Sequence, residues 1–221
     1  DNAQILAELD PDQLAVVTAI RGPVCVIAGA GTGKTRVITN RIAYAINAGV
    51  TDPTKVLALT FTAKAAGEMR ARLRVLGISN AAARTFHSAA LKQLLYFWPY
   101  AFGGQFPSLL TTKSGFISQA ITRAEVAIPA QVNALREIAS EIEWAKVLEI
   151  SPQDYQERAI ESSRLVKLPN SKTQGENLSM IAQVYEAYES LKKQERTLDF
   201  EDVLLLTVGM LEEDRGVRER V

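Results

Sequence analysis

Residues 24–42 read VCVIAGAGTGKTRVITNRI: an apolar run, a glycine-rich turn and an amphipathic segment. The apolar run at 24–28 is rich in β-branched residues, which predicts a short buried strand. From Lys34 to about Asn47 the apolar residues recur at helical spacing, and Gly49 follows as a stop signal, so a helix is predicted there. A strand that turns through glycines into a helix N-terminus is typical of a loop that holds phosphate groups.

The turn, AGAGTGKT at 28–35, departs by one residue from the pattern G-x-x-x-x-G-K-[ST], because Ala28 stands where the first glycine is expected. The other glycines still let successive backbone N–H groups turn inward and form a nest for an anion. Lys34 is predicted to reach the β- and γ-phosphates of a nucleoside triphosphate, and Thr35 to offer its hydroxyl to Mg²⁺. A glycine-rich turn without a ligand is the alternative, and the Lys-Thr pair in register argues against it. The predicted nucleotide site comprises Ala28, Gly29, Ala30, Gly31, Thr32, Gly33, Lys34 and Thr35, of which Lys34 and Thr35 are the catalytic residues.

Strands and helices are predicted to alternate around this loop. Asp10 followed by Pro11 marks the start of a short helix. Apolar runs at 56–60 and 82–86 predict two further strands, each followed by a helical pattern. Such alternation is typical of a parallel sheet with crossover helices. After a loop rich in proline and glycine at 99–115, only helices are predicted, at 116–126, 131–148, 152–165 and 176–194.

The composition is that of an ordinary globular protein. Of 221 residues, 47% are hydrophobic and 23% charged, which excludes an intrinsically disordered chain. Cys25 is the only cysteine, so no intramolecular disulfide can form, and a cytoplasmic location is expected. No apolar stretch approaches the ~20 residues of a bilayer-spanning helix, so no membrane association is expected. The net charge is zero, although residues 55–92 carry seven basic side chains against one acid.

A nucleotide-hydrolysing site also needs an acidic residue that positions Mg²⁺, and the run VLLLTVGMLEED at 203–214 is the candidate. It could be a strand that ends in catalytic acids. A helix accounts for it better, because Asp199 suits the N-cap, Asp202 lies in the first turn and the apolar residues share one face. The terminal acids would then lie at a solvated helix end. We therefore expect residues 1–221 to lack a second acidic strand and to be inactive alone.

Four further stretches accompany the phosphate loop: LDPDQ at 9–13, LALTFTAKAAGEMRARL at 57–73, ARTFHSAAL at 83–91 and LDFEDVLLL at 198–206. In this order they resemble the amino-terminal half of the superfamily 1A DNA helicases, the group of UvrD, Rep and PcrA. Over 113–195 the resemblance is weak and rests on helical character. It implies an α/β fold, in which a P-loop (RecA-like) parallel-sheet motor subdomain at 1–112 and 196–221 is interrupted by an all-helical insertion subdomain at 113–195.

The resemblance assigns two further residues to the nucleotide site. Gln13 matches a glutamine that reads adenine, and a side-chain amide can pair with the N6 and N7 edge of that base. The spacing Asp10-x-x-Gln13 is also that of a capping box, and both roles are compatible. Arg36, directly after the loop, is expected to contact the nucleotide. The cofactors implied are ATP and Mg²⁺.

Two stretches match segments that contact single-stranded DNA in this family. In the first, Phe61 would stack on a base while Thr60, Thr62 and Lys64 meet the backbone. The family usually has asparagine where this chain has Ala63, which puts one polar contact in doubt. A core aromatic at a strand end is the alternative for Phe61. The second segment supplies Thr85, Phe86 and His87, and His87 is expected to position DNA or the sheet end.

The resemblance implies an ATP-dependent DNA helicase or translocase that moves 3′ to 5′ on single-stranded DNA in repair or replication, with other DNA-repair proteins as partners. The alternatives are a P-loop domain of another kind: a small kinase whose helical block is a substrate lid, or a nucleotide-gated interaction module. Trp144 and Lys146, on one helical stripe, are expected to be core and surface residues of the helical block.

Overall fold

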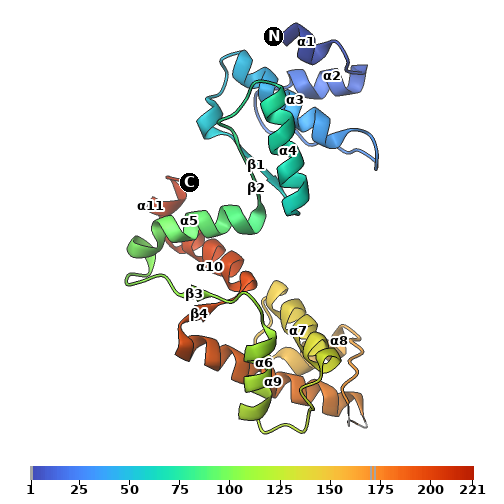
Figure 1. The fold of residues 1–221 in the computed structure, drawn as a ribbon, viewed down its shortest axis with the longest axis vertical. Coiled ribbons are helices and arrows are strands. Elements are labelled where there is room, and N and C mark those ends of the chain that lie inside the picture. Colours follow the sequence, from blue (N-terminus) through green and yellow to red (C-terminus); the bar gives the residue numbers. More distant parts are fainter. Residues whose placement is uncertain (1, 170, 172) are drawn as a thin grey trace. The chain divides into compact units, whose positions relative to one another are not determined.

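The computed structural model describes residues 2–169, 171 and 173–221, which form two compact units, one up to Ala89 and one from Ala90 onward (Figure 1). The first unit contains α1 (Asn2–Leu6), α2 (Pro11–Thr18), α3 (Lys34–Asn47), the 3₁₀ turn η1 (Pro53–Lys55), β1 (Leu57–Thr60), α4 (Ala63–Val75) and β2 (Ala82–Thr85). Helix α5 (Phe86–Ala101) begins in the first unit and continues into the second. The first unit therefore contains both helices and short strands.

Strands β1 and β2 pair in parallel, with Leu57 opposite Ala82 and Thr60 opposite Thr85. Helix α4 is the crossover between them, and Thr62 caps it by accepting a hydrogen bond from the Ala65 amide. The predicted parallel arrangement with a crossover helix is thus confirmed here. The first unit's core lies between this strand pair and its helices, and consists of Ile5, Val17, Val37, Ala43, Ala58, Met69, Leu73, Ile78 and Ala83.

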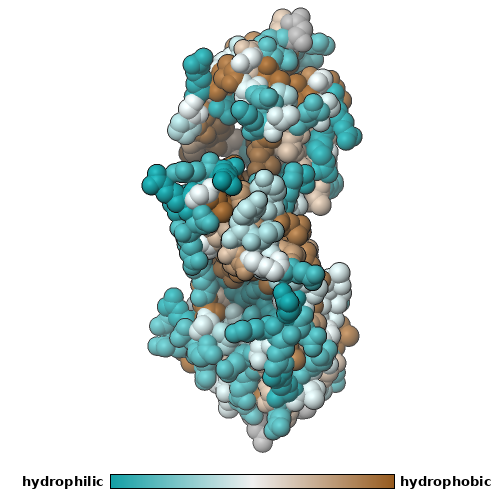
Figure 2. Space-filling model, turned by 90° about the vertical axis from the view of Figure 1, so that its left-hand side faces the viewer, coloured by the Kyte–Doolittle hydropathy of each residue, from teal (hydrophilic) through white to brown (hydrophobic). Residues whose placement is uncertain are grey.

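The prediction of a buried strand at 24–28 is wrong. The segment carries no strand pairing in the structure, and Val24, Val26 and Ile27 are exposed by 41%, 48% and 99%. A strand needs the backbone of a neighbour to satisfy its N–H and C=O groups, and among the residues that the structure describes β1 pairs with β2 alone. The segment therefore keeps its apolar character without a partner that would bury it. Hydrophobic residues, coloured brown, reach the surface on the face drawn in Figure 2.

The second unit holds the remainder of the chain. It contains β3 (Ser108–Leu109), α6 (Ser114–Arg123), α7 (Val132–Val147), α8 (Tyr155–Glu161), α9 (Gln174–Glu195), β4 (Thr197–Leu198), α10 (Phe200–Glu213) and α11 (Arg215–Arg218). We call α6–α9 the helical block; β3 and β4, at its entrance and exit, pair in parallel. Its core is built on fully buried Ile117, Ile138, Ile142, Ile181, Tyr155 and Tyr188.

Helix α10 begins as the sequence predicts. Asp199 is its N-cap and accepts a hydrogen bond from the Asp202 amide, while the Asp202 carboxylate accepts one from the Asp199 amide. This capping box removes the alternative of a strand ending in catalytic acids. On its buried face, Val203 and Met210 share a core with Leu94 and Phe97 of α5.

The prediction of Lys146 as a surface residue is wrong. Its side chain is 3% exposed, and its Nζ lies 2.9 Å from both carboxylate oxygens of Asp199. Lys192 is equally buried and lies 2.9 Å from Asp199 Oδ2. We call the five residues Lys146, Glu189, Lys192, Asp199 and Asp202 the charge cluster. Burial alone would raise the pKa of Asp199, but the two ammonium groups hold that pKa well below its usual range.

Removing one cation from the charge cluster should lower the free energy of unfolding more than removing one from the surface. Lys146→Met would leave the buried Asp199 and the partly buried Glu189 and Asp202 with one ammonium, which we expect to lower the free energy of unfolding by about 3–5 kcal/mol. Urea denaturation followed by circular dichroism measures this loss. Arg158→Met is the matched control, because Arg158 pairs with Glu161 at the surface, where such pairs contribute ~0–1 kcal/mol. Equal losses for both variants would contradict a stabilising role for the cluster.

Candidate functional site

The phosphate loop closes on itself around its own lysine. Gly31 and Gly33 both have φ of +80°, a conformation that residues with a Cβ rarely adopt. Lys34 donates hydrogen bonds to the carbonyl oxygens of Ala28 (3.3 Å) and Gly29 (2.5 Å), and Thr32 Oγ1 donates to the same Gly29 oxygen (2.9 Å). These acceptors are neutral, and none of the salt bridges within 2–169 and 173–221 involves Lys34. Its positive charge therefore remains available for an anion.

Helix α3 starts at this loop with its backbone donors uncapped. Gly33 is the N-cap residue and has no side chain to accept a hydrogen bond from the first turn. The first N–H groups of a helix carry a partial positive charge, which favours an anionic ligand. Thr35 lies in this first turn, half-buried. The loop, the helix start and Lys34 thus concentrate positive potential in one place.

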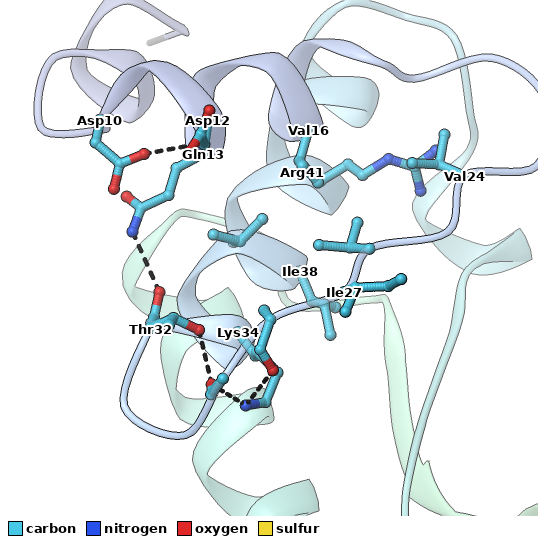
Figure 3. Close-up of a pocket in the computed structure, with 14 residues that line it drawn as sticks. Asp10, Asp12, Gln13, Val16, Val24, Ile27, Thr32, Lys34, Ile38 and Arg41 are labelled. Atoms are coloured by element: carbon cyan, nitrogen blue, oxygen red, sulfur yellow. Dashed lines mark hydrogen bonds between the residues drawn. The ribbon is translucent and has the colours of Figure 1, made fainter.

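A cavity of about 590 Å³ opens beside the loop (Figure 3). Its wall includes the predicted residues Gln13, Ala28, Gly29, Thr32 and Lys34. The side-chain Nε2 of Gln13 donates to the Thr32 carbonyl oxygen at 3.3 Å, and the backbone N–H of Gln13 donates to Asp10 Oδ1 at 2.8 Å, as Figure 3 shows. The capping role of Asp10 and the contact of Gln13 with the loop therefore coexist. The size of the cavity is that of a site for a small organic ligand.

Arg36 is not brought to this cavity. Its Nη2 donates to Glu8 Oε2 at 2.8 Å and to the Glu8 carbonyl oxygen at 3.1 Å. It lines a separate cavity together with Arg72 and Asn40. Successive helical residues point about 100° apart, so Lys34 and Arg36 face different sides of α3.

Several residues of the cavity wall were not predicted from the sequence. Arg41 lies two turns after Lys34 on the same face of α3, and it donates to the Ala19 carbonyl oxygen from Nε (3.0 Å) and Nη2 (2.7 Å). Helical spacing from Lys34 would have identified it. The apolar part of the wall comes from α2, from the exposed segment 24–28 and from α3: Val16, Val24, Val26, Ile27, Val37 and Ile38. No motif marks these side chains.

The second group of predicted residues gathers at one edge of the strand pair. Because β1 and β2 are parallel and Thr60 lies opposite Thr85, the residues that follow both strands meet there. The rings of Phe61 and Phe86 lie 5.3 Å apart at an interplanar angle of 36°. Phe61 is 87% exposed and Phe86 43%. The alternative of Phe61 as a core aromatic is therefore wrong. We call the two exposed rings, Phe61 and Phe86, the aromatic step.

The polar residues around this aromatic step differ in how they are engaged. Thr62 serves as the α4 cap, and Thr85 Oγ1 accepts a hydrogen bond from the Ser88 amide at 3.1 Å. Lys64 is exposed, whereas Arg70 donates to the Ala83 carbonyl oxygen at 2.7 Å. His87, half-buried at the start of α5, lies beside the step in sequence. Lys64 is thus a cation of this edge that is exposed to solvent.

The described part of the chain contains one group of acids close enough to hold a metal ion: Glu189, Asp199 and Asp202 of the charge cluster. Two lysine ammonium groups already lie among these carboxylates. The cluster is therefore an ion-pair network and not a metal centre. No helix within 2–169 or 173–221 is both long and apolar enough to cross a membrane.

The chain is similar in sequence to known DNA helicases. The model of the UvrD/REP helicase N-terminal domain matches residues 9–221. ATP-dependent DNA helicase UvrD2 of Mycobacterium tuberculosis is 41% identical over 97% of this chain, which covers 31% of the relative. ATP-dependent DNA helicase Rep of Buchnera aphidicola is 32% identical over 94% of the chain, covering 29% of the relative. ATP-dependent DNA helicase PcrA of Leuconostoc citreum is 30% identical over 94%, covering 26%.

The chain spans about a third or less of the length of these relatives. The match nevertheless includes the phosphate loop, both strands that end at the aromatic step, the helical block and α10. The chain belongs to the family of the UvrD/REP helicase N-terminal domain.

Proposed function

We propose that the protein is an ATP-dependent DNA helicase or translocase acting on single-stranded DNA, and that the two units described here supply its phosphate loop and part of its DNA path. The observation that carries the proposal is the exposed pair Phe61–Phe86 at the edge of a strand pair, in the same unit as the phosphate loop. Exposed aromatic rings next to a cation are the feature that unstacked bases require. A helicase assignment also agrees with the printed names of the relatives.

On the nucleotide side, the cavity beside the phosphate loop suits ATP. The triphosphate would lie on the loop against Lys34 and the uncapped start of α3, which together offset its negative charge. The base would lie toward Gln13, whose amide can exchange its bond with Thr32 for the adenine edge. Arg36 would contact the nucleotide only after its salt bridge with Glu8 breaks.

Mg²⁺ fits the donor set at Thr35 with help from the nucleotide. A hydroxyl oxygen is a ligand of the type that Mg²⁺ accepts, and this ion is usually held by few protein groups together with phosphates and water. Bound there, the ion would neutralise charge on the transferred phosphate. The protein's own contribution is to place Thr35 in the first turn of α3, next to Lys34.

On the DNA side, we assign stacking to Phe61 and Phe86 and backbone contacts to Thr60, Thr62, Lys64, Thr85 and His87. Their grouping follows from the parallel register, which puts Thr60 opposite Thr85. The family resemblance also supports 3′ to 5′ movement, a role in DNA repair or replication with partner proteins from those processes, and a motor subdomain (1–112 and 196–221) interrupted by a helical insertion (113–195).

Replacing the phosphate-loop lysine should remove ATP hydrolysis without unfolding the protein. Lys34→Ala deletes an exposed cation whose hydrogen bonds go to loop carbonyl groups, so circular dichroism should match the parent. Loss of one phosphate-stabilising group typically costs about 10²–10³ in kcat. A phosphate-release assay on the complete protein measures this. Lys55→Ala, an exposed lysine of the same unit, should keep full activity; comparable activity of both variants would refute the assignment.

Stacking and charge can be separated at the aromatic step. Phe61→Ala should weaken single-stranded DNA binding by about 1–3 kcal/mol and leave the salt dependence unchanged. Lys64→Ala should instead make the plot of log affinity against log salt shallower, by about 0.7 for a lost phosphate contact. Fluorescence anisotropy over a series of salt concentrations gives both quantities.

The control for this comparison is Val75→Ala. Val75 lies on α4 of the same unit and is 87% exposed, the same fraction as Phe61. Its truncation removes equally exposed apolar surface away from the aromatic step and should leave binding unchanged. If all three variants bind like the parent with one common slope, DNA does not follow this edge.

A further inference from the structure

The charge cluster joins α7 and α9 of the helical block to the start of α10. Lys146 comes from the last turn of α7, Glu189 and Lys192 from the last part of α9, and Asp199 and Asp202 from the capping box of α10. Each lysine reaches both aspartates, and Lys192 lies 2.5 Å from Asp202 Oδ2. Tyr188 adds a hydrogen bond from its hydroxyl to Asp199 Oδ2 at 3.0 Å.

Burial raises the free energy needed to separate α7 from α10 at the charge cluster. Asp199 is 1% exposed and both lysine side chains are 3% exposed. A small displacement of α10 from α7 that admits little water would leave Lys146 buried without its two aspartates, which is strongly unfavourable. The surroundings of the junction reinforce it: β3 and β4 pair next to the cluster, and Lys113, just before α6, bridges Glu143 of α7 and Glu201 of α10.

Hinges, by contrast, are usually a few loop residues with little buried contact around them. The only residue between α9 and β4 is Arg196, and the N-cap Asp199 follows β4 directly. Arg196 donates to the Gln105 carbonyl oxygen, and Asp199 lies in the cluster. The exit of the helical block therefore offers no free segment to bend.

We infer that the charge cluster fixes the helical block to α10 as one rigid arm, so that the block does not swing as a lid. A buried ion network of this kind specifies one geometry, because any other arrangement of the three elements would leave charges without partners. The inference is independent of the helicase proposal, because it concerns only the residues from Ala90 onward. It argues against a kinase-like role for the block as a closing substrate lid.

Distance measurements between spin labels on α9 and α10 test this inference. Labels at Gln183→Cys and Glu212→Cys, both at exposed positions, would be placed in the complete protein after Cys25 and any other native cysteines are replaced. The parent should give one narrow distance distribution, unchanged when a non-hydrolysable ATP analogue is added. A distance that changes with the analogue would overturn the inference.

Asp202→Asn is the variant that tests the cluster itself. Asparagine can still accept the hydrogen bond from the Asp199 amide, so the cap of α10 is kept while a charge that contacts both lysines is lost. We expect the distance distribution to broaden about twofold, as local opening becomes populated. Lys146→Met is the second variant, and Arg158→Met is the control, whose distribution should equal that of the parent. Distributions for Asp202→Asn and Lys146→Met that remain as narrow as the parent's would also overturn the inference.

Discussion

The parallel pairing of β1 with β2 is the constraint on which the proposed DNA edge depends. Parallel strands end at the same edge, so the register that sets Thr60 opposite Thr85 also brings Phe61 beside Phe86. Neither ring belongs to the core of this unit, which includes Ala58, Met69 and Ala83. The Phe61 ring, 87% exposed, contributes little to the core of this unit and is therefore accessible for the stacking on DNA that we propose.

The phosphate loop follows a related logic on α3. Glycines at positive φ shape the loop, and the helix start behind it carries the complementary charge. Lys34 rests on neutral carbonyl groups, so anion binding replaces weak contacts with stronger ones. Gln13 links the loop to α2 through Thr32, and this bond would connect the proposed base site to the proposed phosphate site.

Local chemistry decided what could be predicted from the sequence. The helix caps at Asp10, Thr62 and Asp199 depend on residues three positions apart, and the spacing alone revealed the α10 capping box. The glycine-lysine pattern likewise predicted a tight turn into a helix, and the structure has Gly31 and Gly33 at positive φ before α3. Features set by distant residues were not predictable in this way. Segment 24–28 has the composition of a buried strand but lacks a partner, and Lys146 finds its aspartates 53 and 56 positions later in the chain.

We propose that single-stranded DNA stacks at the Phe61–Phe86 step. Photocrosslinking of the complete protein to iodouracil-substituted oligothymidylate, with the attached peptides mapped by mass spectrometry, tests it directly. Iodouracil reacts with aromatic side chains on which it stacks, so crosslinks should fall at Phe61 or Phe86 and decrease when unlabelled single-stranded DNA competes. Crosslinks confined to other parts of the chain, with both phenylalanines unmodified, would contradict the claim.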